Sequence, residues 1–366
     1  MNRPQHISGA AGNSRRAARG FTLVEILVAL GLGVLILLAL TILFSRNTGN
    51  HAELERTTRQ LESARFSLDM LGEDLMHAGY FGEFNPNTLP PPLTLLAPAP
   101  TPDPCATALD AQGWYTRPPA PLPAAPLPAP GPNEIYVPAP VQGIAAGTAI
   151  GCLTNRVPGT EAIVVRHAET GAATPLATAS ANHLYIQVAR CATEVPVTPV
   201  RAAAGQSADF TLTRPDCATV NNALRRLTQR TYYIASCNDC VANDGIPTLK
   251  RVEMVDGQLR TLSVAEGVEN LQVEYGVDTA APNGQPDVFV TTGSGVINGV
   301  LPNVWENVVS VRVHLLTRSS QPTPGFSDTR TYQLGPDVAV ATPADGNKRT
   351  LMTTTVRLNN VGGRRE

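Results

Sequence analysis

A long apolar run lies near the N-terminus of this chain, and a single acidic residue lies at its start. The run covers residues 21–44, and Glu25 is the only charged residue between Arg19 and Arg46. The 19 residues from 26 to 44 would form a helix of about 28 Å, which nearly matches the roughly 30 Å of a bilayer's hydrocarbon core. An ionised carboxylate without a partner costs about 2–4 kcal/mol at depth in a bilayer. The sequence therefore predicts a membrane-spanning helix whose acid needs a positive partner.

The residues before the run are basic. Residues 1–20 contain four arginines and no acid. Because positive charge before a span keeps that end cytoplasmic, the chain after residue 46 is expected on the far side of the membrane. A secretory signal peptide has its small-residue cleavage site after the apolar core, whereas here the small residue, Gly20, precedes the core. Cleavage after Gly20 would leave the span attached and start the mature chain at Phe21.

The stretch GFTLVE, residues 20–25, resembles the prepilin motif of type IV pilins and of type II secretion pseudopilins. That motif consists of a basic leader, Gly, Phe, Glu as the fifth mature residue and an apolar helix. The resemblance implies that a membrane peptidase cuts between Gly20 and Phe21 and methylates the new amine of Phe21. It also implies that Glu25 pairs with the amine of a neighbouring subunit, because opposite charges offset each other's desolvation. Outside this context, Glu25 would mark only the interfacial end of a membrane helix.

The helical pattern continues beyond the apolar run. Apolar residues recur at helical spacing: Leu54, Leu61, Leu68, Leu71, Leu75 and Ala78. Charged residues fill the other faces, and Gly79 and Gly82 are stop signals. The sequence predicts one helix from Phe21 to about Gly79. Residues 21–45 would lie in the membrane or in a filament core, and residues 46–80 would be an amphipathic continuation whose apolar stripe holds a globular head.

A proline-rich insert follows the helix at residues 86–140. It holds 18 of the chain's 32 prolines. Proline excludes helix and inner strand, so the insert is expected to be extended or polyproline-like. Ligand docking on such a segment is possible, and a spacer or surface insertion is the favoured interpretation. Cys105 and Trp114 indicate that part of the insert is tied to the head.

Residues 141–366 are predicted to form a strand-rich head. Short runs rich in β-branched and aromatic residues, or with alternating apolar positions, predict strands: 133–139, 162–168, 183–189, 231–236, 248–255, 271–277, 309–315 and 350–360. The runs 231–236 and 248–255 flank a turn-rich loop and predict a hairpin. One long helix followed by consecutive strands predicts an α+β fold, with an antiparallel sheet packed on the helix.

Three late segments resemble the PilW family of minor pilins: GVENLQVEYGVD, WENVVSVRVHLLTRS and TTTVRLNN. The resemblance implies a type IV pilin-like fold and a minor pilin that primes the pilus and lies at or near its tip, contributing to motility or adhesion. Its implied partners are other minor and major pilins, the prepilin peptidase, the inner-membrane assembly machinery and membrane lipid. The implied location is the inner membrane, as a single-pass protein with a periplasmic head, and then the pilus surface.

Two other functions remain open. A J-like pseudopilin of a type II secretion system would share the leader and the helix. Alternatively, the head could be a tip adhesin that binds a surface ligand. Binding of the head to surface components would favour the adhesin, whereas binding to other pilins alone would not.

All six cysteines follow the apolar run, which fits disulfides in an oxidising compartment. Sequence proximity predicts the pairs Cys105–Cys152, Cys191–Cys217 and Cys237–Cys240. The last pair is a CxxC, a spacing that redox and zinc sites also use. With no second CxxC, and with this one in a predicted turn, a structural disulfide is favoured. Residues 238–244 contain Asn and Asp without the spacing of a calcium loop, so solvated turn residues are favoured.

Sequence signals of other function classes are weak. The net charge of −2 gives no indication of a nucleic-acid partner. The chain has no phosphate-binding loop, dinucleotide fingerprint, HExxH or GxSxG motif, and its six histidines do not cluster in sequence. We therefore expect assembly rather than catalysis, with no cofactor and no metal.

Overall fold

The computed structural model describes residues 20–84, 94–96, 102–114, 134–194, 200–205, 208, 210–218, 221–279, 282–292 and 304–365. The chain divides into two compact units, Met1–Glu55 and Arg56–Glu366. The predicted leader, apart from Gly20, and most of the predicted proline-rich insert lie outside the described residues.

One long helix, α1 (Leu23–His77), contributes residues to both units. It begins two residues after Phe21 and ends two residues before Gly79, close to the predicted limits. Gly79 and Gly82 adopt φ of 74° and 73°, a left-handed conformation that glycine adopts without strain and that commonly ends helices. The Gly79 amide then donates to the Arg166 carbonyl at 2.9 Å, which passes the chain from the helix to the strands.

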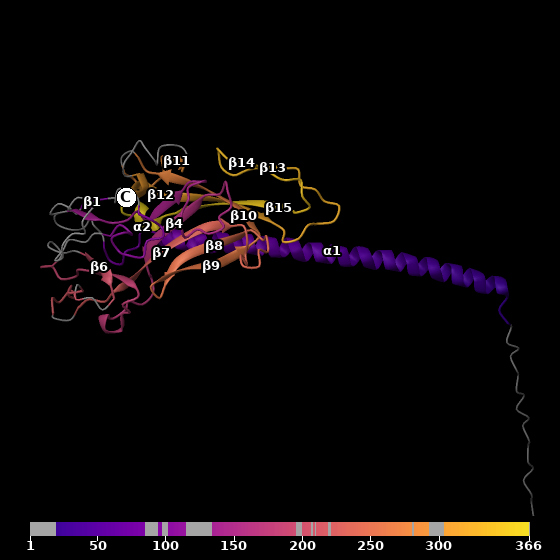
Figure 1. The fold of residues 1–366 in the computed structure, drawn as a ribbon, viewed down its shortest axis with the longest axis horizontal. Coiled ribbons are helices and arrows are strands. Elements are labelled where there is room, and N and C mark those ends of the chain that lie inside the picture. The colour runs from indigo at the N-terminus through magenta and orange to yellow at the C-terminus, as the bar shows by residue number, and fades with distance from the viewer. Residues whose placement is uncertain are drawn as a thin grey trace, which may run out of the picture. The chain divides into compact units, whose positions relative to one another are not determined.

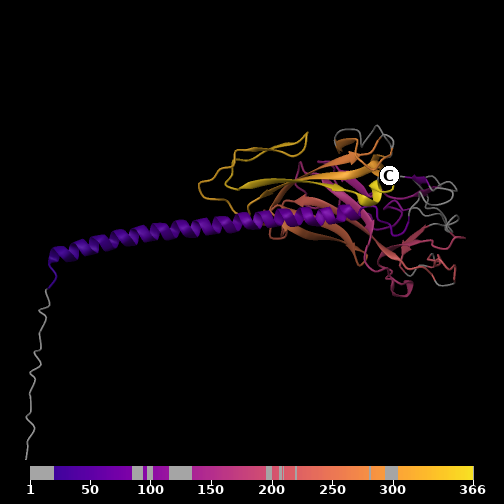
Figure 2. The ribbon, with the colours of Figure 1, turned by 180° about the vertical axis from the view of Figure 1, so that it is seen from behind.

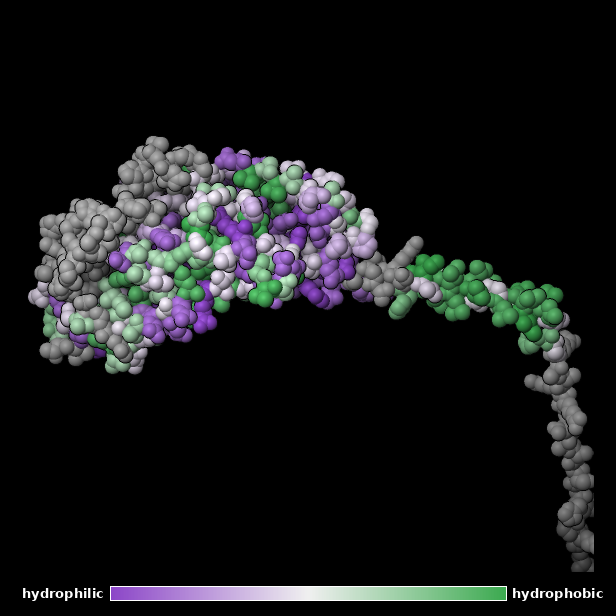
Figure 3. Space-filling model, in the orientation of Figure 1, coloured by the Kyte–Doolittle hydropathy of each residue, from purple (hydrophilic) through white to green (hydrophobic). Residues whose placement is uncertain are grey.

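The first unit is described from residue 20 and consists mainly of the N-terminal part of α1. Its segment Leu23–Phe44, 22 residues, is long and apolar enough to cross a membrane, and none of it is buried. Figure 3 shows hydrophobic residues along this segment. In water such a surface would be strongly unfavourable, so the segment requires lipid or other helices around it.

Two large antiparallel sheets form the second unit. The first contains β3 (Val141–Ile144), β4 (Ala162–Ala168), β5 (Leu184–Val188), β6 (Val200–Ala204), β7 (Arg225–Ala235), β8 (Thr248–Val255) and β9 (Gln258–Glu266). The second has the order β11 (Val288–Thr291), β10 (Val268–Val277), β12 (Val308–Arg318) and β15 (Arg349–Arg357).

Shorter elements complete the second unit. β1 (Thr94–Leu96) pairs in parallel with β2 (Glu134–Tyr136), and β13 (Thr331–Gln333) pairs antiparallel with β14 (Ala339–Ala341). The short helices are η2 (Leu176–Thr178), η4 (Val304–Asn307) and α2 (Asn359–Gly362).

The predicted α+β class is confirmed, and so is the β7–β8 hairpin, in which Tyr233 pairs with Lys250. The head differs from the prediction in having two large sheets rather than one. The unpredicted strand β9 had a readable signal. Asp256 and Gly257, with φ of 50° and 77°, make the two-residue turn between β8 and β9. An Asp-Gly pair between strands favours this type of turn.

The main hydrophobic core joins the end of α1 to both sheets. Leu71 and Leu75 pack in one buried cluster with side chains such as Ile234 of β7, Val273 of β10 and Val311 of β12. In Figures 1 and 2 the C-terminal part of α1 lies among the strands of both sheets. The helix therefore shares a single core with the two sheets.

The head starts earlier than the predicted boundary at residue 141. Trp114 is buried, and its ring lies edge-on to Phe81 with centroids 4.8 Å apart. Cys105 is bonded to Cys152. Residues 102–114 of the predicted insert therefore belong to the packed head, since a buried indole and a disulfide fix them there.

Only the C-terminal part of the predicted apolar stripe faces the head, where Leu71, Leu75 and Ala78 are buried and Leu68 packs against the same core. Leu54 and Leu61 are 66% and 40% exposed, whereas Gln60, Ala64 and Ser67 are buried. The Gln60 amide nitrogen donates to the main-chain oxygen of Thr317 in β12, at 3.0 Å. Small and hydrogen-bonded polar residues permit a close approach of helix and sheet, and this leaves the two leucines on the surface.

Candidate functional site

Thr22 and Glu25 form a reciprocal set of hydrogen bonds at the start of α1. The Glu25 carboxylate oxygen Oε2 accepts from the Thr22 amide at 2.9 Å and from the Thr22 hydroxyl at 2.8 Å. The Glu25 amide in turn donates to the Thr22 hydroxyl oxygen at 3.3 Å. This is a capping box, which satisfies helix-start amides that have no partner within the helix. The sequence pattern Thr-x-x-Glu carried this signal, although the prediction for Glu25 did not use it.

The capping box occupies only one oxygen of the carboxylate. Both Thr22 hydrogen bonds go to Oε2, and within the described part of the chain no group donates to Oε1. The Glu25 side chain is exposed. A carboxylate in this position can therefore cap its own helix and still accept a hydrogen bond, or pair with a positive charge, from another molecule.

Gly20 and Phe21 lie just outside the helix. Neither is helical, and both are exposed, with Phe21 at 82%. A Cβ built on Gly20 would meet nothing within 4 Å. The bond between them thus lies in exposed chain outside the helix, which is the kind of segment that a peptidase can bind.

Asp74 attaches α1 to the first sheet through a buried polar cluster. Its carboxylate accepts from the Arg230 guanidinium and from the Tyr232 hydroxyl, each at 2.5 Å, and lies 3.7 Å from His167 Nε2. Arg230 also bonds Glu253 at 2.9 Å, so the cluster continues along β8. A buried carboxylate that loses these partners would be left with its full desolvation cost.

The charge state of Asp74 follows from its neighbours. Burial acts to raise the pKa of Asp74, but the nearby His167 ring, the Arg230 charge and the Tyr232 hydroxyl together lower it below the usual value. The same burial and the nearby Asp74 charge raise the pKa of Tyr232. Asp74 is therefore ionised at neutral pH. Tyr232 stays protonated and donates a hydrogen bond to Asp74.

Three disulfides are present, and their pairing is the one expected from sequence proximity. Cys105–Cys152 links the predicted insert to the head, Cys191–Cys217 closes a loop after β5, and Cys237–Cys240 lies in the β7–β8 loop. Each removes chain entropy from the unfolded state.

The β7–β8 loop is organised by hydrogen bonds to its own main chain. Asp244 accepts from the amides of Asn238, Asp239 and Ile246, and Asp239 accepts from those of Val241 and Ala242. These bonds lower the pKa of Asp244. The two carboxylates are thus used as turn-stabilising acceptors, as Asp side chains often are. Among the described residues no group of three or more His, Cys, Asp or Glu side chains could hold a metal ion.

The cluster around Asp74 was missed by sequence reasoning. Asp74 lies between Leu71 and Leu75 on the side of the helix that meets the core, and an acid within an apolar stripe was the available signal. Its partners Arg230 and Tyr232 lie 156 and 158 residues away, so sequence spacing does not identify them.

Comparison with known proteins gave three kinds of result. Residues 15–41 match the family model described as Prokaryotic N-terminal methylation motif, and residues 231–360 match the one described as Type IV Pilus-assembly protein W. Among solved structures, a type IV-like pilin from Thermus thermophilus matches at 10% sequence identity and a TM-score of 0.26, over 55% of this chain and 78% of that chain. That score is too low to carry an argument. No curated protein matches the chain.

Proposed function

We propose that this chain, whose residues 231–360 belong to the PilW family of type IV pilus-assembly proteins and whose N-terminus carries a methylation motif, is a minor pilin that helps to prime pilus assembly. The observation that carries the proposal is the Glu25 carboxylate. It caps the start of an exposed apolar helix with one oxygen and leaves the other unoccupied among the described residues.

Processing comes first in this proposal. The methylation motif and the apolar segment Leu23–Phe44 fit a membrane-anchored pilin. A membrane peptidase would cut between Gly20 and Phe21, which are exposed and outside the helix. The cut would remove the basic leader and create a free amine on Phe21, which would then be methylated.

Docking of a new subunit follows from the charges at the helix start. The mature N-terminus would carry a positive amine, and Glu25 would carry a negative charge in the next turn. In a low-dielectric environment, the Glu25 Oε1 atom of one subunit and the Phe21 amine of its neighbour would each compensate the other's desolvation. This pairing fixes the axial register of neighbouring helices, because it forms only when the two charged groups are level.

Lateral contact would use exposed apolar side chains of α1. Leu23–Phe44 is wholly exposed, and Leu61, in the part of α1 that belongs to the head, is 40% exposed. Burying such side chains against neighbouring helices is favourable, at about 25 cal/mol per Å² of apolar surface removed from water. Other minor and major pilins are the proposed partners, and the pilus surface is the proposed final location.

A comparison of Glu25→Gln and Thr22→Ala tests the proposal. Glutamine also completes a capping box, so E25Q keeps the helix start and removes only the charge. In a strain lacking the chromosomal gene, wild type should restore surface pili, E25Q should not, and T22A should do so largely. Intact mass should show a methylated chain starting at Phe21 in all three, and only when the prepilin peptidase is present.

Two outcomes would contradict the proposal. Full restoration of pili by E25Q would show that the charge is not used in docking. A chain that still starts at Met1 when the peptidase is present would show that the leader is not processed.

The same strains separate this proposal from a type II secretion pseudopilin. If the chain is a minor pilin, loss of the gene should reduce surface pili and leave secretion of type II substrates unchanged. If it is a pseudopilin, loss of the gene should reduce secretion and leave surface pili unchanged. The family match over residues 231–360 supports the pilus.

A further inference from the structure

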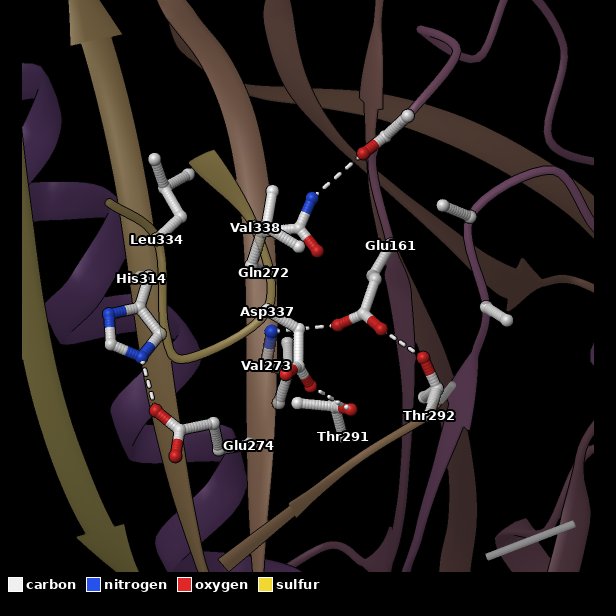
Figure 4. Close-up of a pocket in the computed structure, with 13 residues that line it drawn as sticks. Glu161, Gln272, Val273, Glu274, Thr291, Thr292, His314, Leu334, Asp337 and Val338 are labelled. Carbon is white, nitrogen blue, oxygen red and sulfur yellow. Dashed lines mark hydrogen bonds and ion pairs between the residues drawn. The ribbon is translucent and has the colours of Figure 1, made fainter. Parts of the chain in front are cut away.

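A pocket of about 500 Å³ opens on the polar face of the second sheet. Its lining comes from the residue before β4, from β10, from the end of β11, from β12 and from the segment between β13 and β14. Figure 4 shows these elements around the pocket, with Glu161, Gln272 and Asp337 among the side chains that line it. A volume of this size accommodates a small organic group.

The first group of the pocket that can bind a ligand is the Gln272 side chain. This side chain is 95% buried, since only 5% of it is exposed. Its amide nitrogen donates to the Gly159 carbonyl at 2.8 Å and to Asn270 Oδ1 at 2.9 Å, which fixes the orientation of the amide. The amide oxygen then has no donor among the described residues. The oxygen is not among the buried atoms that lack a partner, so it stays accessible from the pocket and can accept a hydrogen bond from an N–H or O–H of a ligand.

The second group that can bind a ligand is Glu161, which is also only 5% exposed. Its carboxylate accepts from the Val273 amide at 2.8 Å and from the Thr292 hydroxyl. No lysine, arginine or histidine of the described part of the chain lies in ion-pair contact with it. The cation that acts on it through space is Arg156, whose guanidinium donates to the main-chain oxygens of residues 144, 145, 148 and 160.

The neighbouring carboxylates do not share this lack of a positively charged partner or of contact with solvent. Glu274 lies 2.7 Å from His314 Nε2 and 3.2 Å from Arg312, so a fixed positive charge is already beside it. Asp337 is exposed and accepts from the Thr291 hydroxyl at 3.0 Å. The uncompensated negative charge of the buried wall is therefore that of Glu161.

We propose that this pocket binds a primary alkylammonium group, which pairs with the Glu161 carboxylate and donates a hydrogen bond to the Gln272 amide oxygen. An ammonium suits both groups at once, since it carries N–H donors for the Gln272 oxygen and a positive charge for Glu161. A neutral hydroxyl would satisfy Gln272 but would leave Glu161 without a counter-charge.

The rest of the lining suits the alkyl part of such a ligand. Ala145, Ala146, Leu334 and Val338 contribute apolar surface to the same pocket. A chain of four or five methylene groups against this wall would be buried with its charged end at Glu161. Free alkylamines and lysine side chains share this chemistry.

Isothermal titration calorimetry of the full chain in a neutral detergent tests the proposal. The probes are pentylammonium, N-acetyl-lysine N-methylamide and 1-pentanol. Both ammonium probes should bind with one site per chain, and 1-pentanol should bind at least about tenfold more weakly, because it lacks the charge-assisted contact. Tighter binding of the lysine derivative would assign the pocket to a protein side chain, and tighter binding of pentylammonium would assign it to a free amine.

Three variants make the result specific. Glu161→Gln preserves shape and the Val273 contact and should weaken ammonium binding by about tenfold or more, the usual effect of losing a charged partner. Ala146→Phe fills the pocket from an exposed position and should abolish binding without disturbing buried hydrogen bonds. Asp256→Asn removes an exposed acid in the β8–β9 turn, outside the pocket lining, and should leave binding unchanged. Equal binding of 1-pentanol, or ammonium binding that survives both E161Q and A146F, would overturn the proposal, as would the absence of binding by either ammonium probe.

Discussion

Asp74→Asn is the perturbation whose effect the structure defines most sharply. Asparagine keeps the size of the side chain but removes the negative charge that faces Arg230, and it has one acceptor oxygen where the carboxylate uses one for Arg230 and the other for the Tyr232 hydroxyl. Breaking a buried ion pair by removing one partner costs about 3–5 kcal/mol. Arg230 is 25% exposed at its side chain and keeps Glu253 as a second partner. We therefore expect a loss near the lower end, about 3 kcal/mol of unfolding free energy.

Urea unfolding of the full chain in detergent would measure this loss. Trp305 reports on the core that holds Leu71 and Leu75, because it is 9% exposed within that cluster. Asp69→Asn is the matched control, since Asp69 lies on the exposed side of the same helix. The control should change the unfolding free energy by less than about 0.5 kcal/mol. A D74N value that is equally small would refute the role assigned to the Asp74 cluster.

The pH dependence of the difference in unfolding free energy between wild type and D74N provides an independent check. Because the pKa of Asp74 is lowered in the folded state, its contribution is fully present above the unfolded value of about 3.9. This contribution to stability is lost as the pH falls through the lower pKa that Asp74 has in the folded state. The stability difference between wild type and D74N should therefore be constant from pH 5 to 7 and should shrink below about pH 4. A difference that grows on acidification would contradict this assignment.

Three further changes have defined outcomes. Gly143→Ala should destabilise the head by about 2 kcal/mol in urea unfolding, because the added Cβ would lie 2.5 Å from the Tyr275 hydroxyl and 2.8 Å from Trp305, whereas Gly151→Ala, with nothing within 4 Å, should be nearly neutral. Replacing Cys105 and Cys152 by serine should cost about 4 kcal/mol, and the same change at Cys237 and Cys240 about 2 kcal/mol, since the longer loop loses more chain entropy; equal losses would contradict that account. Thr22→Ala should raise the amide hydrogen exchange of Glu25 by removing a cap worth about 1 kcal/mol, while Thr22→Ser should not.

The local features of this chain could be predicted because each depends on neighbouring residues. The apolar segment and the helix limits follow from composition and from Gly79 and Gly82. The β7–β8 hairpin follows from two strand-forming runs around a short loop. The disulfides join cysteines at separations of 47, 26 and 3 residues, so proximity in sequence was sufficient to pair them.

Glu25 has two features, a charge available to another subunit and a helix cap, and only the first was predicted from the sequence. Its place after Gly-Phe-Thr pointed to a charge used between subunits, which stays a proposal. The structure adds that the same carboxylate caps its own helix through Thr22. The charge and the cap use different oxygens of one side chain, and only atomic positions separate them.

By itself, the sequence determined the main elements: a membrane-length helix with one acid, its continuation as a helix, and a strand-rich head cross-linked by three disulfides. Periodicity and composition act over a few residues, so these elements were readable. The polar contacts between α1 and the head were decided by the tertiary structure, because Gln60 bonds Thr317, 257 residues away, and Asp74 bonds Arg230, 156 residues away. The pocket has the same origin, since Glu161 and Gln272 become neighbours only when the edge of β10 meets the residue before β4. Such contacts depend on which polar groups find partners across the fold, and no local pattern encodes that choice.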